Sequence, residues 1–429
     1  MKKKYVRWTL WTIASPFILF VILCILIYLP PIQNFLVDKA AVYASEATGM
    51  NISVGRISLS FPLNLVVTDV DAASPHNDTL LSVRRLQVNV QLLPLLKKQV
   101  EVDGISLQGA TVNSNDLIHG MKLNGTLGEL FISSHGVALD PETAIVNKVL
   151  LKDTDLSLCL NDTAAVDTAA SDTTYWKIIL QDIDLQNVSF ALDMPLDSLS
   201  LAASLDNAIL RDGLIDLHKS AYSLQTFRIK NGRVRYDSGK PLAADSLPSG
   251  LDPSHIALTD IGVKLDSLYY EGRNMKAIIS QFVLKERSGV EIVSATGRMV
   301  SNDKVLRVPS LKLETRDSYL ELNAAMDWNA LDFKGEGLVS ARLMADIGKP
   351  DVVRFMGRMD EKFVRQYPSE PLRIRTGIDG DLNKLKLTTL TAELPGALGL
   401  FARGELTHLT DSLLRGGDIT LEAETKDLK

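Results

Sequence analysis

Apolar and polar residues alternate along most of the chain from Ile52 onward. Alternation with a period of two places apolar side chains on one face of a β-strand and polar side chains on the other. Gly, Asn and Asp separate the alternating segments, which favours an antiparallel meander over a βαβ arrangement. The segments are ISVGRISLSF, LQVNVQLL, VEVDGISLQGATV, IILQDIDL, VSFALD, FRIKNGRVRY and LKLETRDSYLELNAAMDW. The pattern predicts a mainly β fold.

A local pattern recurs in four of these regions. Two apolar residues stand two apart, a Gly, Asn or Asp follows two residues later, and a second apolar stretch restarts on a shifted phase. The copies are Ile105, Leu107, Gly109 and Val112; Val149, Leu151, Asp153 and Leu156; Ile183, Leu185, Asn187 and Phe190; and Phe227, Ile229, Asn231 and Val234. The turn-forming residue supplies a bulge or tight turn that keeps the apolar side chains on one face.

The candidate apolar-face residues are therefore Ile105, Leu107, Val112, Ile183, Leu185, Phe190, Phe227, Ile229 and Val234. The intervals between copies are irregular, which argues against a solenoid of fixed period. Ordinary β-sandwiches also contain such motifs, so the pattern alone leaves a reiterated sheet module and a sandwich equally open.

The N-terminal region predicts a membrane anchor. Residues 11–29 carry no charge, and about 20 such residues cross the hydrocarbon core of a bilayer as a helix. Trp11, Phe17, Phe20 and Leu29 belong to this anchor, and the topology charges Lys2, Lys3, Lys4 and Arg7 precede it. The positive-inside rule keeps this basic tail, residues 1–10, in the cytoplasm and exports the body. The alternative is a cleaved signal peptide, whose apolar region is shorter and ends at a small-residue site, whereas Pro30 and Pro31 end this run.

Two further helices and two loops interrupt the strands. Residues 30–49 predict an amphipathic helix with Gly49 as its stop, which lies against the membrane surface or plugs one end of the sheet. Residues 350–367 predict a second amphipathic helix that covers the sheet locally, with partner binding as the alternative. Residues 161–174 and 237–255, rich in Asp, Ser, Thr, Ala or Pro, predict loops.

Composition and charge narrow the function classes. Hydrophobic residues make up 46% and charged residues 23%, as in a folded chain. The net charge is −6, and the sequence contains no basic block of the kind that binds nucleic acid. The two cysteines and six histidines form no metal-ligand spacing. No GxSxG, P-loop or strand-associated GxGxxG is present. We therefore expect neither catalysis nor a cofactor, although an anchored hydrolase with a dispersed site is a rival hypothesis.

The N-terminal layout resembles the TamB/AsmA-like family of bacteria with two membranes. The resemblance is carried by the anchor, by PPIQNFLVDKAAVYASEATGMNISVGRISLSFPLNLVVTDVDA and by DTLLSVRRLQVNVQLLPLLKKQVEVDGISLQGATVN. Later stretches such as LRIRTGIDGDLNKLKLTTLTAELPGALGLFARGEL resemble the reiterated groove strands of the family. The family implies a long U-shaped sheet that is held in the inner membrane, reaches across the periplasm and shelters lipid acyl chains on an apolar inner face.

The resemblance also sets the expected partners. These are phospholipid acyl chains, the inner membrane, and an Omp85-type outer-membrane protein contacted through a C-terminal domain of longer members that this sequence lacks. Residues 50–429 are thus expected to form a periplasmic β-groove region, truncated at its C-terminus. The hypothesis is a non-enzymatic bridge for phospholipid transport or outer-membrane protein assembly; the alternative is a periplasmic scaffold that binds proteins by β-augmentation without lipid.

Overall fold

The structure is a computed structural model that describes residues 39, 41–42, 45–46, 48–60, 64–74, 78–91, 102–114, 120–138, 142–161, 175–239, 250–332, 337–357 and 359–425. The predicted anchor, residues 11–29, and the basic tail lie outside these residues. Within the described part, no helix has both the length and the apolar character that a bilayer span requires. The chain divides into two compact units: Met1–Ala138 with Ala144–Ala164, and Leu139–Thr143 with Ala165–Lys429.

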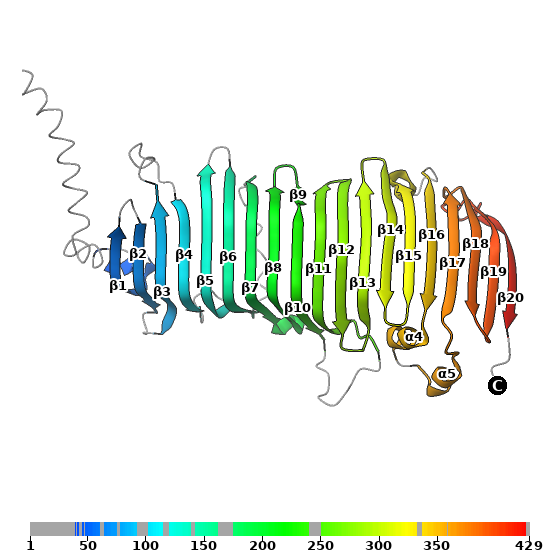
Figure 1. The fold of residues 1–429 in the computed structure, drawn as a ribbon, viewed down its shortest axis with the longest axis horizontal. Coiled ribbons are helices and arrows are strands. Elements are labelled where there is room, and N and C mark those ends of the chain that lie inside the picture. The colour runs from blue at the N-terminus through cyan, green and yellow to red at the C-terminus, as the bar shows by residue number, and fades with distance from the viewer. Residues whose placement is uncertain are drawn as a thin grey trace, which may run out of the picture. The chain divides into compact units, whose positions relative to one another are not determined.

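The prediction of a mainly β fold is confirmed, because strands make up most of the described residues (Figure 1). The first unit contains β1 to β6, and β1 to β5 are antiparallel neighbours in sequence order. Their bounds are β1 Asn51–Ser60, β2 Asn64–Ala73, β3 Thr79–Val90, β4 Val102–Asn113, β5 Met121–Ala138 and β6 Thr143–Leu160. A Cβ on Gly125 of β5 would meet Leu156 Cδ2 at 2.8 Å, which places β6 beside β5.

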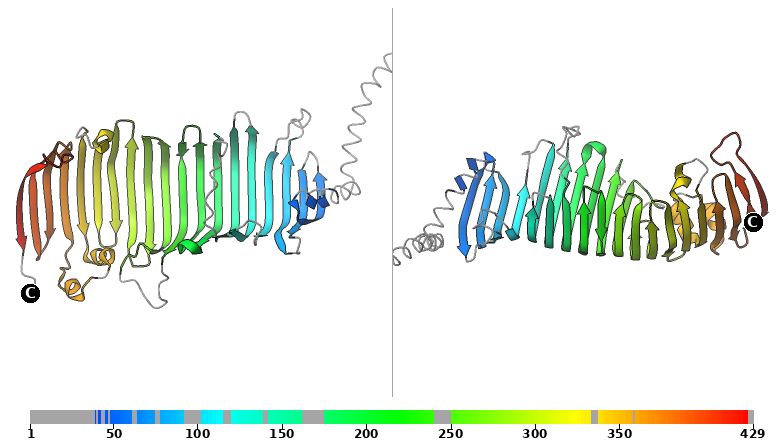
Figure 2. Two further views of the ribbon diagram at one scale, coloured as in Figure 1. Left: turned by 180° about the vertical axis from the view of Figure 1, so that it is seen from behind. Right: turned by 90° about the horizontal axis from the view of Figure 1, so that it is seen from above.

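The second unit is a sheet of antiparallel neighbours from β7 to β20, which the two views of Figure 2 show from behind and from above. Short β9 pairs with β8 and β11, and β10 continues alongside both strands. The strands are β7 Lys177–Met194, β8 Leu199–Asp216, β9 Ala221–Leu224, β10 Thr226–Ser238, β11 His255–Glu271, β12 Asn274–Glu286, β13 Glu291–Ser301, β14 Val305–Thr315, β15 Tyr319–Asp327, β16 Val339–Ile347, β17 Leu372–Gly380, β18 Lys384–Leu394, β19 Leu398–Thr407 and β20 Gly416–Thr425.

Two strand predictions need correction. IILQDIDL and VSFALD are one strand, β7, because Asn187 adopts a positive φ of 51° inside the strand and does not end it. LKLETRDSYLELNAAMDW is a hairpin of β14 and β15, closed at residues 316–318 by a hydrogen bond of 2.9 Å from Thr315 N to Ser318 O. Alternation with the same phase on both sides of a short polar turn cannot reveal that turn.

The helix predicted over residues 350–367 is two helices, α4 Lys349–Met356 and α5 Glu361–Gln366. Gly357 follows α4 with a φ of 70°, a left-handed value that stops the helix. The prediction that the apolar stripe of this helix covers the sheet is wrong, because Phe355, Met356 and Phe363 are 55%, 66% and 50% exposed. Two short 3-10 helices, η1 Pro195–Asp197 and η2 Trp328–Asp332, complete the elements.

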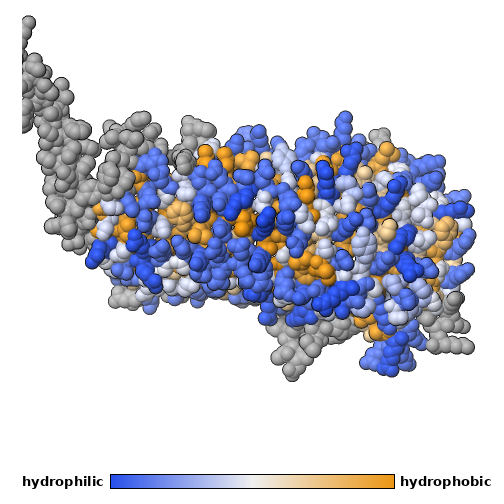
Figure 3. Space-filling model, viewed as in Figure 1, coloured by the Kyte–Doolittle hydropathy of each residue, from blue (hydrophilic) through white to orange (hydrophobic). Residues whose placement is uncertain are grey.

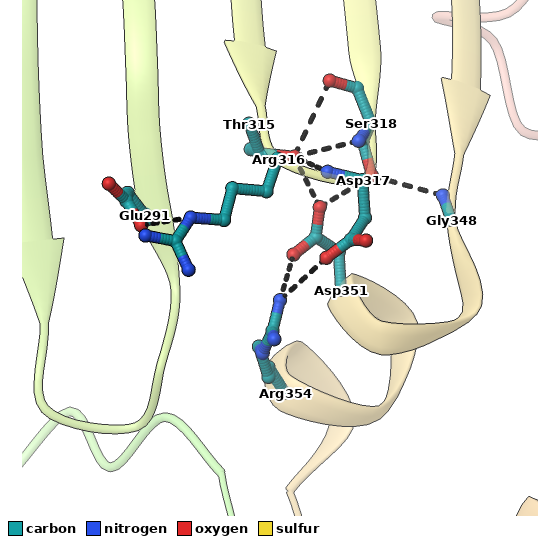
Figure 4. Close-up of polar contacts among 8 residues, drawn as sticks. All are labelled: Glu291, Thr315, Arg316, Asp317, Ser318, Gly348, Asp351 and Arg354. Atoms are coloured by element: carbon teal, nitrogen blue, oxygen red, sulfur yellow. Dashed lines mark hydrogen bonds and ion pairs between the residues drawn. The ribbon is translucent and has the colours of Figure 1, made fainter.

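Polar contacts hold α4 on the sheet. The carboxylate of Asp351 is 1% exposed and accepts hydrogen bonds from the hydroxyl groups of Thr315 and Ser318, the latter at 2.6 Å, and from Arg354 at 3.0 Å (Figure 4). Arg354 also donates to Asp317 at 2.9 Å. The helix is therefore fixed to the turn between β14 and β15 through its buried carboxylate, and its large apolar side chains remain in solvent.

The other predicted segments are only partly described. Residues 39–48 are helical wherever they are described, and Gly49 has a φ of 70° and donates to Ser45 O at 2.9 Å, which confirms the predicted stop. Of the two predicted loops, residues 162–174 and 240–249 lie outside the described residues. The second loop is shorter than expected, because β10 continues to Ser238.

Candidate functional site: the apolar face of the sheet

The turn-forming residues of the recurrent pattern all have left-handed backbone conformations. The φ angles are 62° at Gly109, 50° at Asp153, 51° at Asn187 and 53° at Asn231. Non-glycine residues rarely adopt this region, and Asn and Asp tolerate it best. All four residues lie inside strands, so the predicted tight turn is absent there. The register is regular between β7 and β8, where Gln186 pairs with Asn207 and Val188 with Leu205, but it shifts around Gly232 between β10 and β11, as a bulge would make it do.

One left-handed residue resets the alternation of side chains. A Cβ on Gly232 would lie 3.2 Å from Cγ2 of Ile229, so positions 229 and 232 point to the same side of the sheet. Strict alternation would place residues three apart on opposite faces. Gly213 repeats this arrangement across the left-handed Asp212, because its Cβ would lie 2.9 Å from Cδ2 of Leu210. The shifted phase seen in the sequence therefore keeps the apolar side chains on one face.

In the first unit the candidate residues belong to rows that cross neighbouring strands, because directly opposed residues share a face. Ile105 pairs with Val88 and Ile132, and Val88 pairs with Leu65. The neighbouring row contains Val67, Leu86, Leu107 and Leu130, and a third contains Ala72, Leu81, Val112 and Gly125. Three of the nine candidates thus lie in parallel apolar rows on one face.

In the second unit the register brings together the two copies of the pattern on β7 and β10. Ile183 and Phe227 both pair with Leu210, Leu185 and Ile229 with Ala208, and Phe190 and Val234 with Ala203. On β11 the same rows continue to Leu265, Val263 and Leu258. These six candidates therefore form three adjacent rows, and the two members of each row are 44 residues apart in sequence.

The apolar rows continue over strands from which no candidate was chosen. One row runs from β14 to β20 through Leu313, Leu320, Ala345, Ile374, Ala392, Leu400 and Ala423. Of these strands, β14, β17 and β18 lack the Gly, Asn or Asp at the position that the recurrent pattern requires, so the pattern did not identify them. The uninterrupted alternation of LRIRTGIDG was a signal that could have found β17, whereas the alternation of LKLTTLTAEL shifts its phase between Leu387 and Leu390.

This apolar face is not the closed core of a sandwich. Of the twelve hydrophobic residues that are buried in the described part of the chain, eight are alanines. Ile105 and Phe190 are 38% and 37% exposed, and the other seven candidates are half-buried. Figure 3 shows hydrophobic residues at the surface over the sheet, among hydrophilic ones. A close-packed interior would bury such large aliphatic and aromatic side chains.

The other face of the sheet is polar and carries ion pairs. Arg211 pairs with Asp182 on β7, Lys312 with Glu321 across β14 and β15 at 3.8 Å, and Arg375 with Asp346 across β16 and β17 at 2.8 Å. A hydrogen bond with Asp260 and the charge of this residue raise the pKa of Lys285 on the same face. The sheet is therefore amphipathic, with its ionisable groups on one side.

The described ionisable side chains give no sign of a metal-dependent catalytic site. Within the described residues, no group of three or more His, Cys, Asp or Glu side chains is placed to hold a metal ion. A His255–Asp252 contact of 3.0 Å lies at the start of β11, and its hydrogen bond lowers the pKa of the Asp252 carboxyl. Comparison of the chain with protein-family models and with curated proteins gave no match. The apolar face is the most extended feature that needs a functional explanation.

Proposed function

We propose that the protein shelters phospholipid acyl chains on the apolar face of its sheet, without catalysis, as part of a bridge between bacterial membranes. The observation that carries the proposal is the set of in-register apolar rows whose large side chains stay half-exposed. Exposed apolar area of this extent marks a binding surface, because leaving it in water forgoes about 25 cal/mol per Å². An acyl chain gains about 0.8 kcal/mol for each CH₂ that leaves water.

The dimensions of the rows suit such a ligand. The second unit has thirteen strands in direct succession when β9 is left out, namely β7, β8 and β10 to β20. With neighbouring strands about 4.8 Å apart, its rows extend roughly 58 Å. The hydrocarbon core of a bilayer, in which two acyl chains meet end to end, is about 30 Å thick. One row can therefore accommodate several acyl chains lengthwise, and the transfer along it needs no charged or catalytic group.

We expect phospholipid to co-purify with the full chain extracted in a mild detergent. The measurement is lipid extraction followed by mass spectrometry, with an unrelated single-pass membrane protein purified in the same detergent as the control for carried-over bilayer lipid. Phospholipid at the level of the control, with no lipid retained after extensive washing, would contradict the proposal.

The proposed location is the inner membrane, with the N-terminus in the cytoplasm and the bulk of the chain in the periplasm, on the charges that flank residues 11–29. An alkaline phosphatase fused after Lys429 should then be active, and a green fluorescent protein at the same position, which folds poorly after export, should be dark. The opposite pair of results would contradict the topology. The resemblance to the TamB/AsmA-like family supports the same location and an Omp85-type partner.

One observation favours the rival scaffold. All residues of β20 are exposed, and within the described part of the chain this strand pairs only with β19. A free strand edge is a template for β-augmentation by another protein. A scaffold of this kind needs no lipid, so the lipid measurement separates the two functions: partner capture through β20 from lipid-free protein would favour the scaffold.

A further inference from the structure

The polar face of β10 carries an unusual concentration of positive charge. Its four basic residues are Arg228, Lys230, Arg233 and Arg235. Arg233 lies 3.7 Å from Asp206, and Arg235 lies 2.6 Å from Asp237. Arg228 and Lys230 have no acidic partner within 4.0 Å among the described residues. Half of the positive charge of the strand is therefore not neutralised by the protein itself.

A third cation lies against this pair. Lys264 of β11 is directly opposite Arg228 in the antiparallel register. Directly opposed residues have Cβ atoms about 5 Å apart, and like charges in this arrangement destabilise a sheet. The acid nearest to Lys264 is Asp266, at 3.8 Å, and the hydroxyl group of Ser280 also donates to Asp266. Of these three cations, only Lys264 has a carboxylate within 4.0 Å among the described residues, that of Asp266.

The three cations lie around a hollow of the surface. Arg228, Lys230 and Lys264 line a cavity of about 600 Å³ together with Gln281 and with the aliphatic residues Ile209, Ile229, Val263 and Val283. Asn207 and Asn231 also line it, and their amide groups donate to Asp184 and Asp206. Asp260 also lines this cavity, but its carboxylate is engaged by Lys285 at 2.8 Å. Small-molecule sites occupy about 300 to 1,000 Å³ and place a few polar or charged groups in a mainly apolar lining. The volume and the lining suit a small anion with several oxygen atoms.

We propose that this cavity binds a phosphate group. A guanidinium group recognises phosphate through two parallel hydrogen bonds, and ammonium groups add point charge. The amide of Gln281 is placed to donate to a further oxygen. A bound phosphate anion would also relieve the repulsion between Arg228 and Lys264. The group belongs either to a soluble phosphate compound or to the headgroup of an anionic lipid. The cations of the site lie on the polar face, whereas Ile229 and Val263, which also line the cavity, belong to the apolar row.

The test is isothermal titration of the full chain with inorganic phosphate at low ionic strength. We expect saturable binding, which the double variant Arg228→Gln with Lys230→Gln weakens at least tenfold. The matched control is Arg235→Gln, on the same strand and face but paired with Asp237, and we expect it to change the affinity less than twofold. Circular dichroism and melting temperature establish that all variants are folded. Absence of saturable binding, or equal weakening in the control, would overturn the site.

A second arm identifies the source of the phosphate. Vesicles of phosphatidylglycerol and of phosphatidylcholine are compared as competitors for bound phosphate. Competition by phosphatidylglycerol alone, lost in the double variant, assigns the site to an anionic headgroup; phosphate binding without competition by either vesicle assigns it to a soluble compound. Competition that persists in the double variant would count against this cavity. Lipid that co-purifies on the apolar face should be unchanged in the double variant, so failure here leaves the proposed function standing.

Discussion

Ile229→Glu is expected to remove most of the co-purifying phospholipid from the protein while leaving the protein folded. Ile229 is half-buried and lies in the apolar row that Leu185, Ala208 and Val263 also form. On an open face the new carboxylate stays hydrated when lipid is absent, so the cost to folding is small, below about 1 kcal/mol. When lipid is present, the charge interrupts the row, and burying it under an acyl chain is unfavourable.

Leu185→Glu, two strands away in the same row, should have the same effect. The measurement is the molar ratio of phospholipid to protein together with the melting temperature, which 1 kcal/mol shifts by roughly 2 to 4 °C in a domain of 150 to 250 residues. Ile209→Glu is the matched control, because Ile209 pairs with Arg228 on the polar face of β8 and β10. It introduces the same charge and should keep the lipid.

A closed core would give the opposite result. An unpaired charge buried there costs several kcal/mol, which is comparable to the whole stability of a domain. Aggregation or early melting of both the Ile229 and Leu185 variants, with no lipid on the parent protein, would therefore reject the open face. The scaffold function, with β20 as its docking edge, would then be the better explanation.

The backbone conformations at the turn-forming residues could be predicted from the sequence, because each depends only on the residue itself and its near neighbours in the chain. The left-handed φ angles at Asn187 and Asn231 follow from the ability of asparagine to adopt this conformation, and the phase shift around each of them is visible in the apolar pattern. The stop at Gly49 has the same kind of cause. Each of these predictions needed only a window of about ten residues.

The register between strands could not be predicted in the same way. Ile183 and Phe227 share the partner Leu210 because β7 and β10 both pair with β8, in a register that the connections between these strands set. The irregular intervals between copies of the pattern carry no information about this alignment. The register depends on contacts between residues far apart in sequence, and a shift by one residue would move every apolar side chain to the other face.

The prediction that the helix over residues 350–367 buries its apolar stripe failed for a different physical reason. The spacing of Val352, Phe355, Met356 and Phe363 is typical of a buried stripe, but the residue that anchors the helix is polar. Asp351 finds its partners in the turn between β14 and β15, more than 30 residues earlier in the chain. An acidic residue at the start of a helix is normally explained by the helix dipole alone, so the sequence gives no sign of a buried network.

Asp351→Ala is expected to release α4 from the sheet. The substitution removes the acceptor of three hydrogen bonds and leaves the hydroxyl groups of Thr315 and Ser318 without this buried partner. Burial alone would lower the pKa of Arg354, but its hydrogen bonds to Asp317 and Asp351 raise it, so the guanidinium group depends on both carboxylates. Arg354 is 30% exposed and keeps its pair with Asp317, so the main cost is that of leaving the two buried hydroxyl donors unsatisfied, about 1 to 3 kcal/mol each.

This cost exceeds what an eight-residue helix can offset, because isolated helices of this length are unstable in water. Hydrogen exchange should therefore become fast for the amides of α4 and stay slow for those of β16 and β17, which pair directly with each other from Val339 to Ile347. Glu361→Ala is the control: it removes only the ion pair of Glu361 with Arg365, whose side chains are 84% and 78% exposed, and surface pairs contribute little. Equal acceleration of exchange in α4, β16 and β17 would instead mean that the Asp351 network supports the sheet itself. If only α4 is released, the apolar row through Ala345 and Ile374 should remain intact, and the protein should keep its lipid.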